Sequence, residues 1–218
     1  GVKVDMDGFA RCMEEQRERA RAANTKDAEA AWSTYGGIHA DILKEVGATK
    51  FVGYDNLETE AKVVTLVKGG EKVSKLAEGD EGEVTLDTTP FYAEMGGEVG
   101  DTGTLAGGNF SADVVDTKAP EKGLVCHKVK VRSGEVSVGD TLTAAVDGKR
   151  RARIARNHTA THILHASLRR VLGDHVKQAG SYVGPDRLRF DFTHFEATTP
   201  EQLAEVERIA NDEIMSAV

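Results

Sequence analysis

The sequence has few cysteines, no long hydrophobic run and a shortage of basic charge. Cys12 and Cys126 are its only cysteines and form neither a disulfide framework nor a CxxC pair, which favours a reducing cytosol. No apolar stretch approaches the roughly 20 residues that cross a bilayer, and the N-terminus lacks the pattern of a signal peptide. With 28 Lys and Arg against 36 Asp and Glu, the net charge is −8. This sign counts mildly against a nucleic-acid module, although a local basic patch could still bind one.

The remaining composition is that of an ordinary soluble protein. Apolar residues make up 39% of the 218 positions, enough for the core of one large or two smaller domains. The chain begins with Gly1 rather than Met, and it stops at Val218 inside an unfinished helical pattern of apolar residues. We therefore expect a piece of a longer polypeptide.

Regions of different pattern follow one another along the chain. Residues 5–46 favour helices, with Asp7 as an N-cap and Gly47 as the end of the last one. From residue 50 to 147, short β-rich runs alternate with glycine turns, which is typical of a small β-barrel or sandwich. These runs are residues 61–68, 82–88, 109–116, 124–131 and 141–146.

The C-terminal third has the order helix, hairpin, helix. A helix is predicted over residues 148–172, and two strands over residues 175–183 and 188–194, with a Gly-Pro-Asp turn between them. Thr199 and Pro200 suit the N-cap and first position of the last helix. The chain is thus α+β. The predicted domains are residues 1–48, 49–147 and 148–218.

His158 and His162 lie four residues apart in the predicted helix. A four-residue step turns an α-helix by about 400° and rises about 6 Å, so both imidazoles leave the same face. They can present two nitrogens to one divalent metal, but two ligands do not complete a zinc site, and such pairs also occur by chance. Thr159 stands where metalloproteases carry a catalytic Glu, which disfavours that class. His165 is a third candidate ligand, although helix packing or a surface position explains it more simply.

Residues 90–103 hold four glycines within eight positions. Glycine supplies the positive φ of a tight turn, so a turn between two barrel strands is the first interpretation. Phosphate binding is a weaker one, because the segment is neither a Walker motif nor a dinucleotide-binding loop. In both cases the glycines leave the backbone without side chains, so that a partner can approach it closely.

Basic residues gather just before the two histidines. They are Lys149, Arg150, Arg151, Arg153 and Arg156. This group is either a solvated helix end or a patch that draws an RNA phosphate backbone toward the histidines.

In combination, these motifs resemble alanyl-tRNA synthetase over essentially the whole chain. Residues 158–162 are similar to the first half of that family's editing zinc motif, and residues 89–103 to its glycine-rich barrel segment. Residues 176–181 and 188–192 resemble the editing-domain hairpin. Residues 13–17, Met-Glu-Glu-Gln-Arg, resemble the helix that leads in from the tRNA-recognition region.

The resemblance implies a fold and a set of site residues. The fold would be the helical end of the tRNA-recognition region, a translation-protein-like β-barrel and an incomplete α+β editing domain. His158 and His162 would be zinc ligands. Thr161 would lie near the mischarged amino acid and sense serine's hydroxyl, and Gln178 would line the same pocket. The remaining zinc ligands, a Cys and a His of a CxxxH motif, are expected beyond Val218.

The resemblance also implies an activity. The full enzyme would charge tRNA(Ala) with alanine, using ATP and magnesium in a catalytic domain outside this chain. This region would bind tRNA(Ala) and support zinc-dependent hydrolysis of Ser-tRNA(Ala) and Gly-tRNA(Ala) in the cytoplasm. Glu98 stands where the family often has Gln, a change we expect to be tolerated. A homodimer would cover an exposed apolar face.

Two alternatives compete with this interpretation. The region could be a non-catalytic module for tRNA docking or spacing. It could also be a free-standing trans-editing aminoacyl-tRNA deacylase, which the long helical lead-in disfavours.

Overall fold

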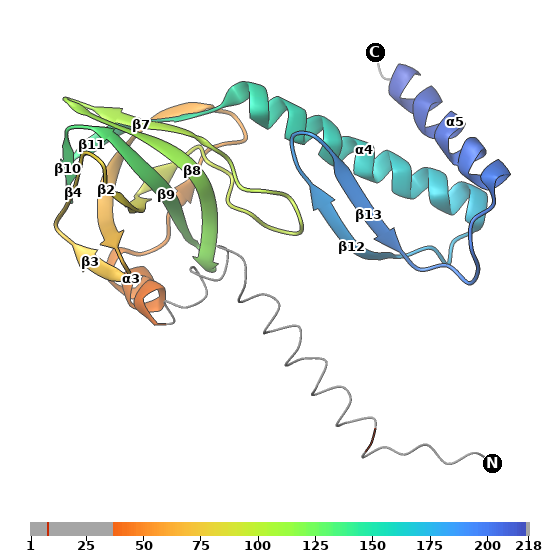
Figure 1. The fold of residues 1–218 in the computed structure, drawn as a ribbon, viewed down its shortest axis with the longest axis horizontal. Coiled ribbons are helices and arrows are strands. Elements are labelled where there is room, and N and C mark those ends of the chain that lie inside the picture. Colours follow the sequence, from red (N-terminus) through yellow and green to blue (C-terminus); the bar gives the residue numbers. More distant parts are fainter. Residues whose placement is uncertain (1–7, 9–36, 217–218) are drawn as a thin grey trace.

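The structure, a computed structural model, describes Gly8 and residues 37–216. Most of the predicted N-terminal helices lie outside these residues, together with Asp7, Cys12 and residues 13–17. Within the described part the fold is α+β, as the sequence predicts (Figure 1). The helices there are α3 (Ile38–Val46), α4 (Gly148–Leu172) and α5 (Pro200–Ser216). The strands are β1 (Lys50–Phe51), β2 (Glu58–Lys68), β3 (Glu71–Val73), β4 (Lys75–Ala77), β5 (Glu81–Leu86), β6 (Thr88–Thr89), β7 (Gly103–Gly107), β8 (Phe110–Glu121), β9 (Leu124–Ser133), β10 (Glu135–Ser137), β11 (Thr141–Val146), β12 (Gln178–Val183) and β13 (Leu188–Phe192).

A closed antiparallel barrel forms the first body of the molecule. Its strand order is β11-β7-β8-β9-β5-β2, and β2 pairs again with β11 to close the ring. Along β8, Phe110, Ala112 and Val114 are buried and alternate with more exposed neighbours, which is the period-two pattern of a strand with one buried face. The barrel core is Ala61, Val63, Leu66, Leu76, Val84, Leu86, Phe91, Leu105, Phe110, Ala112, Val114, Val129, Val131, Val136, Leu142 and Ala144.

One histidine is buried completely within the barrel. His127 is 0% exposed. Its Nδ1 donates to the carbonyl of Val84 at 2.8 Å, so its Nε2 accepts from the hydroxyl of Thr89 at 2.7 Å. Burial lowers the pKa of His127 from 6.5 to about 4, because the imidazolium would lose its hydration. Both ring nitrogens are therefore satisfied only while the ring is neutral.

Helix α4 leads out of the barrel directly after β11 and carries the rest of the described chain (Figure 1). The Asp147 carboxylate caps it by accepting from the backbone N–H groups of Lys149 (3.1 Å) and Arg150 (3.0 Å), and Gly173 ends it with φ 112°. The β12–β13 hairpin and α5 both pack against α4. Their shared core is centred on Leu168, Val176 and Val206.

The sequence places most of these elements closely. The helix over residues 148–172 and the start of α5 at Pro200 are confirmed. The strand predicted over residues 175–183 is too long, since β12 begins at Gln178. The chain turns first, with the N–H of Val176 donating to the carbonyl of Gly173. Among the described residues, no helix is both long and apolar enough to cross a membrane.

Candidate functional site

The two histidines of α4 project from adjacent turns and meet. The Nε2 atoms of His158 and His162 are 3.2 Å apart, and the ring centroids are separated by 5.1 Å. Both residues are exposed on the helix surface. The regular helix produces this pairing, because a four-residue step returns the side chain to nearly the same direction.

A glycine turn brings the barrel to this helix. Residues 95–98 form a tight turn in which Gly96 and Gly97 have φ of 63° and 89°, and both amide groups at its ends pair across it. Two successive positive φ values are those of a type I′ turn, which explains the Gly-Gly pair. A Cβ on Gly97 would lie 2.3 Å from the carbonyl oxygen of Ser181, so this residue allows the turn to pack directly on β12.

The turn is joined to the hairpin by backbone hydrogen bonds. The N–H of Val183 donates to the carbonyl of Gly97 at 2.8 Å, and the N–H of Val99 donates to the carbonyl of Val183 at 3.0 Å. Between these two contacts lies Glu98, which forms an isolated parallel bridge with Val183. The barrel and the hairpin thus fix the backbone of Glu98 from both sides.

Glu98 reaches His158, which lies 60 residues further along the chain. Its carboxylate accepts a hydrogen bond from Nδ1 of His158, and the Glu98 side chain is only 14% exposed. Because a carboxylate oxygen accepts, Nδ1 carries a proton, and this tautomer of the imidazole has its lone pair on Nε2. That lone pair lies beside Nε2 of His162. Metal-binding histidines commonly have this arrangement, in which the second ring nitrogen donates to a carboxylate.

A cavity of about 190 Å³ opens at this meeting point. It gathers the four residues that the resemblance assigns to the zinc site and its pocket, together with residues of the glycine turn and β12. Its lining is Tyr92, Met95, Gly96, Glu98, His158, Thr161, His162, Gln178, Ser181 and Val183. Thr161 is 8% exposed, and its hydroxyl donates to the carbonyl of Asn157 at 2.8 Å. Gln178 is exposed at the start of β12.

His165 does not belong to that lining. Its Nε2 lies 3.5 Å from the carbonyl oxygen of Val176, and its ring contacts Phe190 at a centroid distance of 5.0 Å. His165 lies seven residues beyond His158, which is about 10 Å further along the helix axis, and there it contacts the hairpin instead. Packing therefore explains this histidine.

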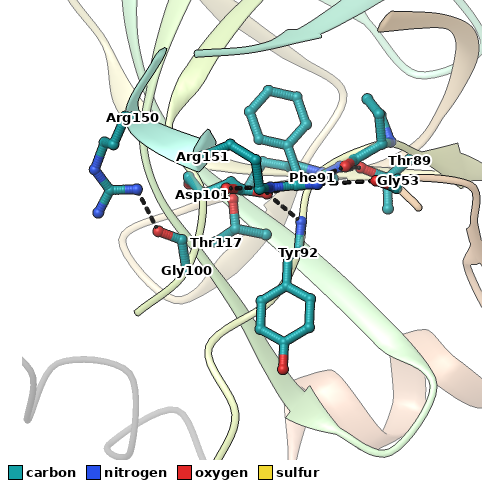
Figure 2. A network of polar contacts seen from close by, with 11 residues as sticks. Gly53, Thr89, Phe91, Tyr92, Gly100, Asp101, Thr117, Arg150 and Arg151 are labelled. Atoms are coloured by element: carbon teal, nitrogen blue, oxygen red, sulfur yellow. Dashed lines mark hydrogen bonds and ion pairs between the residues drawn. The ribbon is translucent and has the colours of Figure 1, made fainter. Parts of the chain in front are cut away.

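Arg151 fastens the first turn of α4 into the barrel (Figure 2). Its Nε lies 2.9 Å from each carboxylate oxygen of Asp101, and its two Nη atoms each donate at 2.9 Å, to the carbonyls of Gly53 and Pro90. The Asp101 side chain is 2% exposed, and it also accepts from the N–H of Tyr92 at 2.6 Å. This network fixes the helix that carries the histidines relative to the barrel segment that carries Glu98.

Three of the five basic residues in the first part of α4 have side-chain partners, and two have none within the described part of the chain. Arg151 is fully engaged, Arg150 donates to the carbonyl of Gly100 at 2.8 Å, and Arg153 forms an ion pair with Asp186. Lys149 and Arg156 form no ion pair with any residue that the structure describes, and both are exposed. These two cations are the ones available to an anionic partner.

A second group of metal-ligand side chains lies apart from the cavity, where α3 covers the barrel. Ligand atoms of His39, Glu83 and Cys126 lie within 4.8 Å of one another, and all three residues are buried. His39 Nε2 and Glu83 Oε2 are 2.8 Å apart, while burial raises the pKa of the Cys126 thiol to about 12. Sequence spacing gives no signal for this group, because its members are at least 43 residues apart.

Comparison with known proteins finds relatives along the whole chain. The profile of the family described as tRNA synthetases class II (A) matches residues 1–150. Alanine–tRNA ligase of Pelotomaculum thermopropionicum is 46% identical over 218 residues, which is 100% of this chain and 25% of the relative. Alanine–tRNA ligases of Caldicellulosiruptor saccharolyticus and Methylococcus capsulatus are each 46% identical, over 100% and 98% of this chain and 24% of each relative. The chain thus spans about a quarter of the length of these relatives. On this evidence the chain belongs to the family of class II tRNA synthetases (A).

Proposed function

We propose that this region forms part of the hydrolytic editing site of an alanine–tRNA ligase. The substrates would be Ser-tRNA(Ala) and Gly-tRNA(Ala), and charging of tRNA(Ala) with alanine, ATP and magnesium would belong to the whole cytoplasmic enzyme. One observation carries the proposal: His158, His162, Thr161 and Gln178 line one cavity, and Glu98 enters it from the barrel.

Hydrolytic editing compensates for weak discrimination between serine and alanine in the activation pocket. Serine differs from alanine by one hydroxyl, and a small activation pocket rejects such an addition poorly. For Ser-tRNA(Ala), a second site can instead recognise the hydroxyl. The oxygen of Thr161 already donates its proton to the carbonyl of Asn157, so it is left as an acceptor on the cavity wall. Serine's hydroxyl can donate to it, whereas the methyl group of alanine cannot.

The two histidines fit one half of a zinc donor set. His158 and His162 would supply two nitrogen ligands, and a Cys and a His of a CxxxH motif would be the others. Glu98 would keep Nε2 of His158 free by holding the proton on Nδ1. When bound, zinc would supply a Lewis acid that anchors the substrate, polarises the ester carbonyl or lowers the pKa of a water.

Two exposed cations of α4 would be available to an RNA substrate in spite of the net negative charge of the chain. Lys149 and Arg156 lie on the same helix as the histidines and are exposed. Phosphate contacts of this kind position a nucleic acid without reading its sequence. Lys149 and Arg156 are seven positions apart, which places both on one face of α4, roughly opposite to His158, so they would contact the tRNA backbone outside the cavity.

The test is deacylation of Ser-tRNA(Ala) by a full-length ligase that carries this region. Replacing His158 and His162 together by Ala should abolish deacylation and leave charging with alanine unchanged. His165→Ala is the matched control, because it removes a histidine of the same helix that does not line the cavity, and it should retain deacylation. Unchanged deacylation in the double variant would refute the assignment. A wild-type protein that binds tRNA without deacylating it would favour the docking module instead.

A further inference from the structure

A larger cavity of about 580 Å³ adjoins the histidine cavity. Three residues, Tyr92, Glu98 and His158, line both cavities. The rest of the larger cavity comes from Phe51 at the end of β1, from the loop that follows it, including Tyr54, and from α4. We call this larger cavity the aromatic groove. The two cavities meet at the side chains where the scissile ester of the proposed substrate would lie.

Aromatic rings form one wall of the groove. Tyr54 is 86% exposed, and its ring stands edge-on to Phe51 with centroids 5.0 Å apart and an interplanar angle of 84°. The rings of Phe51 and Tyr92 are 6.3 Å apart at 72°. A large aromatic side chain at this exposure leaves most of its apolar surface in water. Its π-face is therefore open to a flat partner, such as a nucleobase.

The segment that carries Phe51 and Tyr54 is hydrogen-bonded into the barrel. The N–H of Val52 donates to the carbonyl of Thr89 at 2.9 Å, and the carbonyl of Gly53 accepts from Arg151. A Cβ on Gly53 would lie 2.1 Å from the carbonyl oxygen of Pro90, so only glycine allows this close packing. The groove wall is thus preformed, which limits the entropy that a ligand must offset on binding.

The charges of the groove select a nucleoside rather than a phosphate. Asp55 and Glu98 line it, and its arginine, Arg151, is engaged by Asp101. Carboxylates repel phosphate but accept hydrogen bonds from ribose hydroxyls and from an exocyclic amine. The exposed cations of α4 lie outside this lining.

We propose that the aromatic groove binds the 3′-terminal adenosine of an aminoacyl-tRNA. The proposal rests on the editing function proposed above. The aminoacyl group would occupy the cavity of about 190 Å³, and the ester would lie beside His158. The adenine would stack on Tyr54 in the cavity of about 580 Å³. In this arrangement the aminoacyl group, which is smaller than adenosine, occupies the smaller cavity, and the adenine lies on the exposed ring of Tyr54.

Photocrosslinking locates the base independently of hydrolysis. A tRNA(Ala) with 8-azidoadenosine at its 3′ end is irradiated with the full-length ligase, and crosslinked peptides are mapped. We expect a crosslinked peptide that contains residues 51–57, in addition to any from the charging site. Absence of that peptide would overturn the proposal. If the peptide is crosslinked but the protein does not deacylate Ser-tRNA(Ala), the groove does bind the terminal adenosine and the editing function is refuted.

Deacylation kinetics provide a second test of the groove. Stacking of a base on an aromatic side chain corresponds to roughly 5- to 150-fold in a binding constant by alanine substitution. Tyr54→Ala should lower kcat/KM for Ser-tRNA(Ala) within that range, and Tyr54→Phe should restore it, while charging stays unchanged. Phe195→Ala is the matched control, because Phe195 is also 86% exposed but does not line the groove. Equal losses in the Tyr54→Ala and Phe195→Ala variants, or no loss in either, would overturn the proposal.

Discussion

Replacement of Arg151 by Met tests whether the junction between the barrel and α4 is held by its polar network. Methionine keeps an unbranched apolar stem of similar reach but removes the guanidinium. The Asp101 carboxylate, 2% exposed, would lose the charge that compensates it, and the carbonyls of Gly53 and Pro90 would lose their donors.

The magnitude follows from burial. Removing one partner of a buried ion pair costs about 3–5 kcal/mol, because the remaining charge stays desolvated. Asp101 retains one donor, the N–H of Tyr92, so we expect the lower end, about 3 kcal/mol of unfolding free energy. For a chain of this length that corresponds to a fall in Tm of roughly 6–12 °C.

Thermal and urea unfolding of the 218-residue chain, followed by circular dichroism, measure this change. Arg153→Met is the matched control, since Arg153 pairs with Asp186 on the surface and both side chains are more than half exposed. An exposed pair contributes less than about 1 kcal/mol. If the Arg151 and Arg153 variants unfold within about 0.5 kcal/mol of each other, the network does not hold the junction.

Two further predictions concern the barrel and the glycine turn. The pKa of His127 is about 4 in the folded chain and about 6.5 in the unfolded chain. The free energy of unfolding should therefore be highest above pH 6.5 and fall by up to roughly 3 kcal/mol as the pH is lowered to 4, because only the unfolded chain takes up the proton there. His127→Gln should flatten this acid slope in urea titrations, and an unchanged slope would show that another group causes it. Gly97→Ala should destabilise the chain far more than Gly96→Ala, because both have positive φ but only the Cβ on Gly97 meets a carbonyl oxygen. Equal Tm values for these two variants would contradict the packing of the turn on β12.

Local chemistry allowed much of the fold to be predicted from the sequence. Helix α4 is delimited by a capping Asp147 and a terminating Gly173, and both act at short range. β11 is likewise a predicted run that the structure confirms over Thr141–Val146. Closure of the barrel by β2 and β11 is less visible, because that pairing joins segments about 80 residues apart and no local pattern encodes the partner of a strand.

In the candidate site, too, some contacts follow from local sequence and others from long-range packing. The pairing of His158 with His162 follows from helix geometry alone, whereas the contact between Glu98 and His158 depends on how the glycine turn docks on the hairpin. The buried group of His39, Glu83 and Cys126 is likewise created only where α3 packs on the closed barrel. Long-range packing therefore determines which polar groups surround a locally encoded pair.

The central claim is that His158 and His162 hold zinc. Elemental analysis of the purified full-length ligase tests it most directly, with the two-histidine variant compared against Cys126→Ser, which disables the buried barrel group. The account predicts about one zinc per chain in the wild type and in Cys126→Ser, and none in the variant with both histidines replaced by Ala. Zinc that persists in the histidine variant and disappears in Cys126→Ser would contradict the account and assign the metal to the barrel.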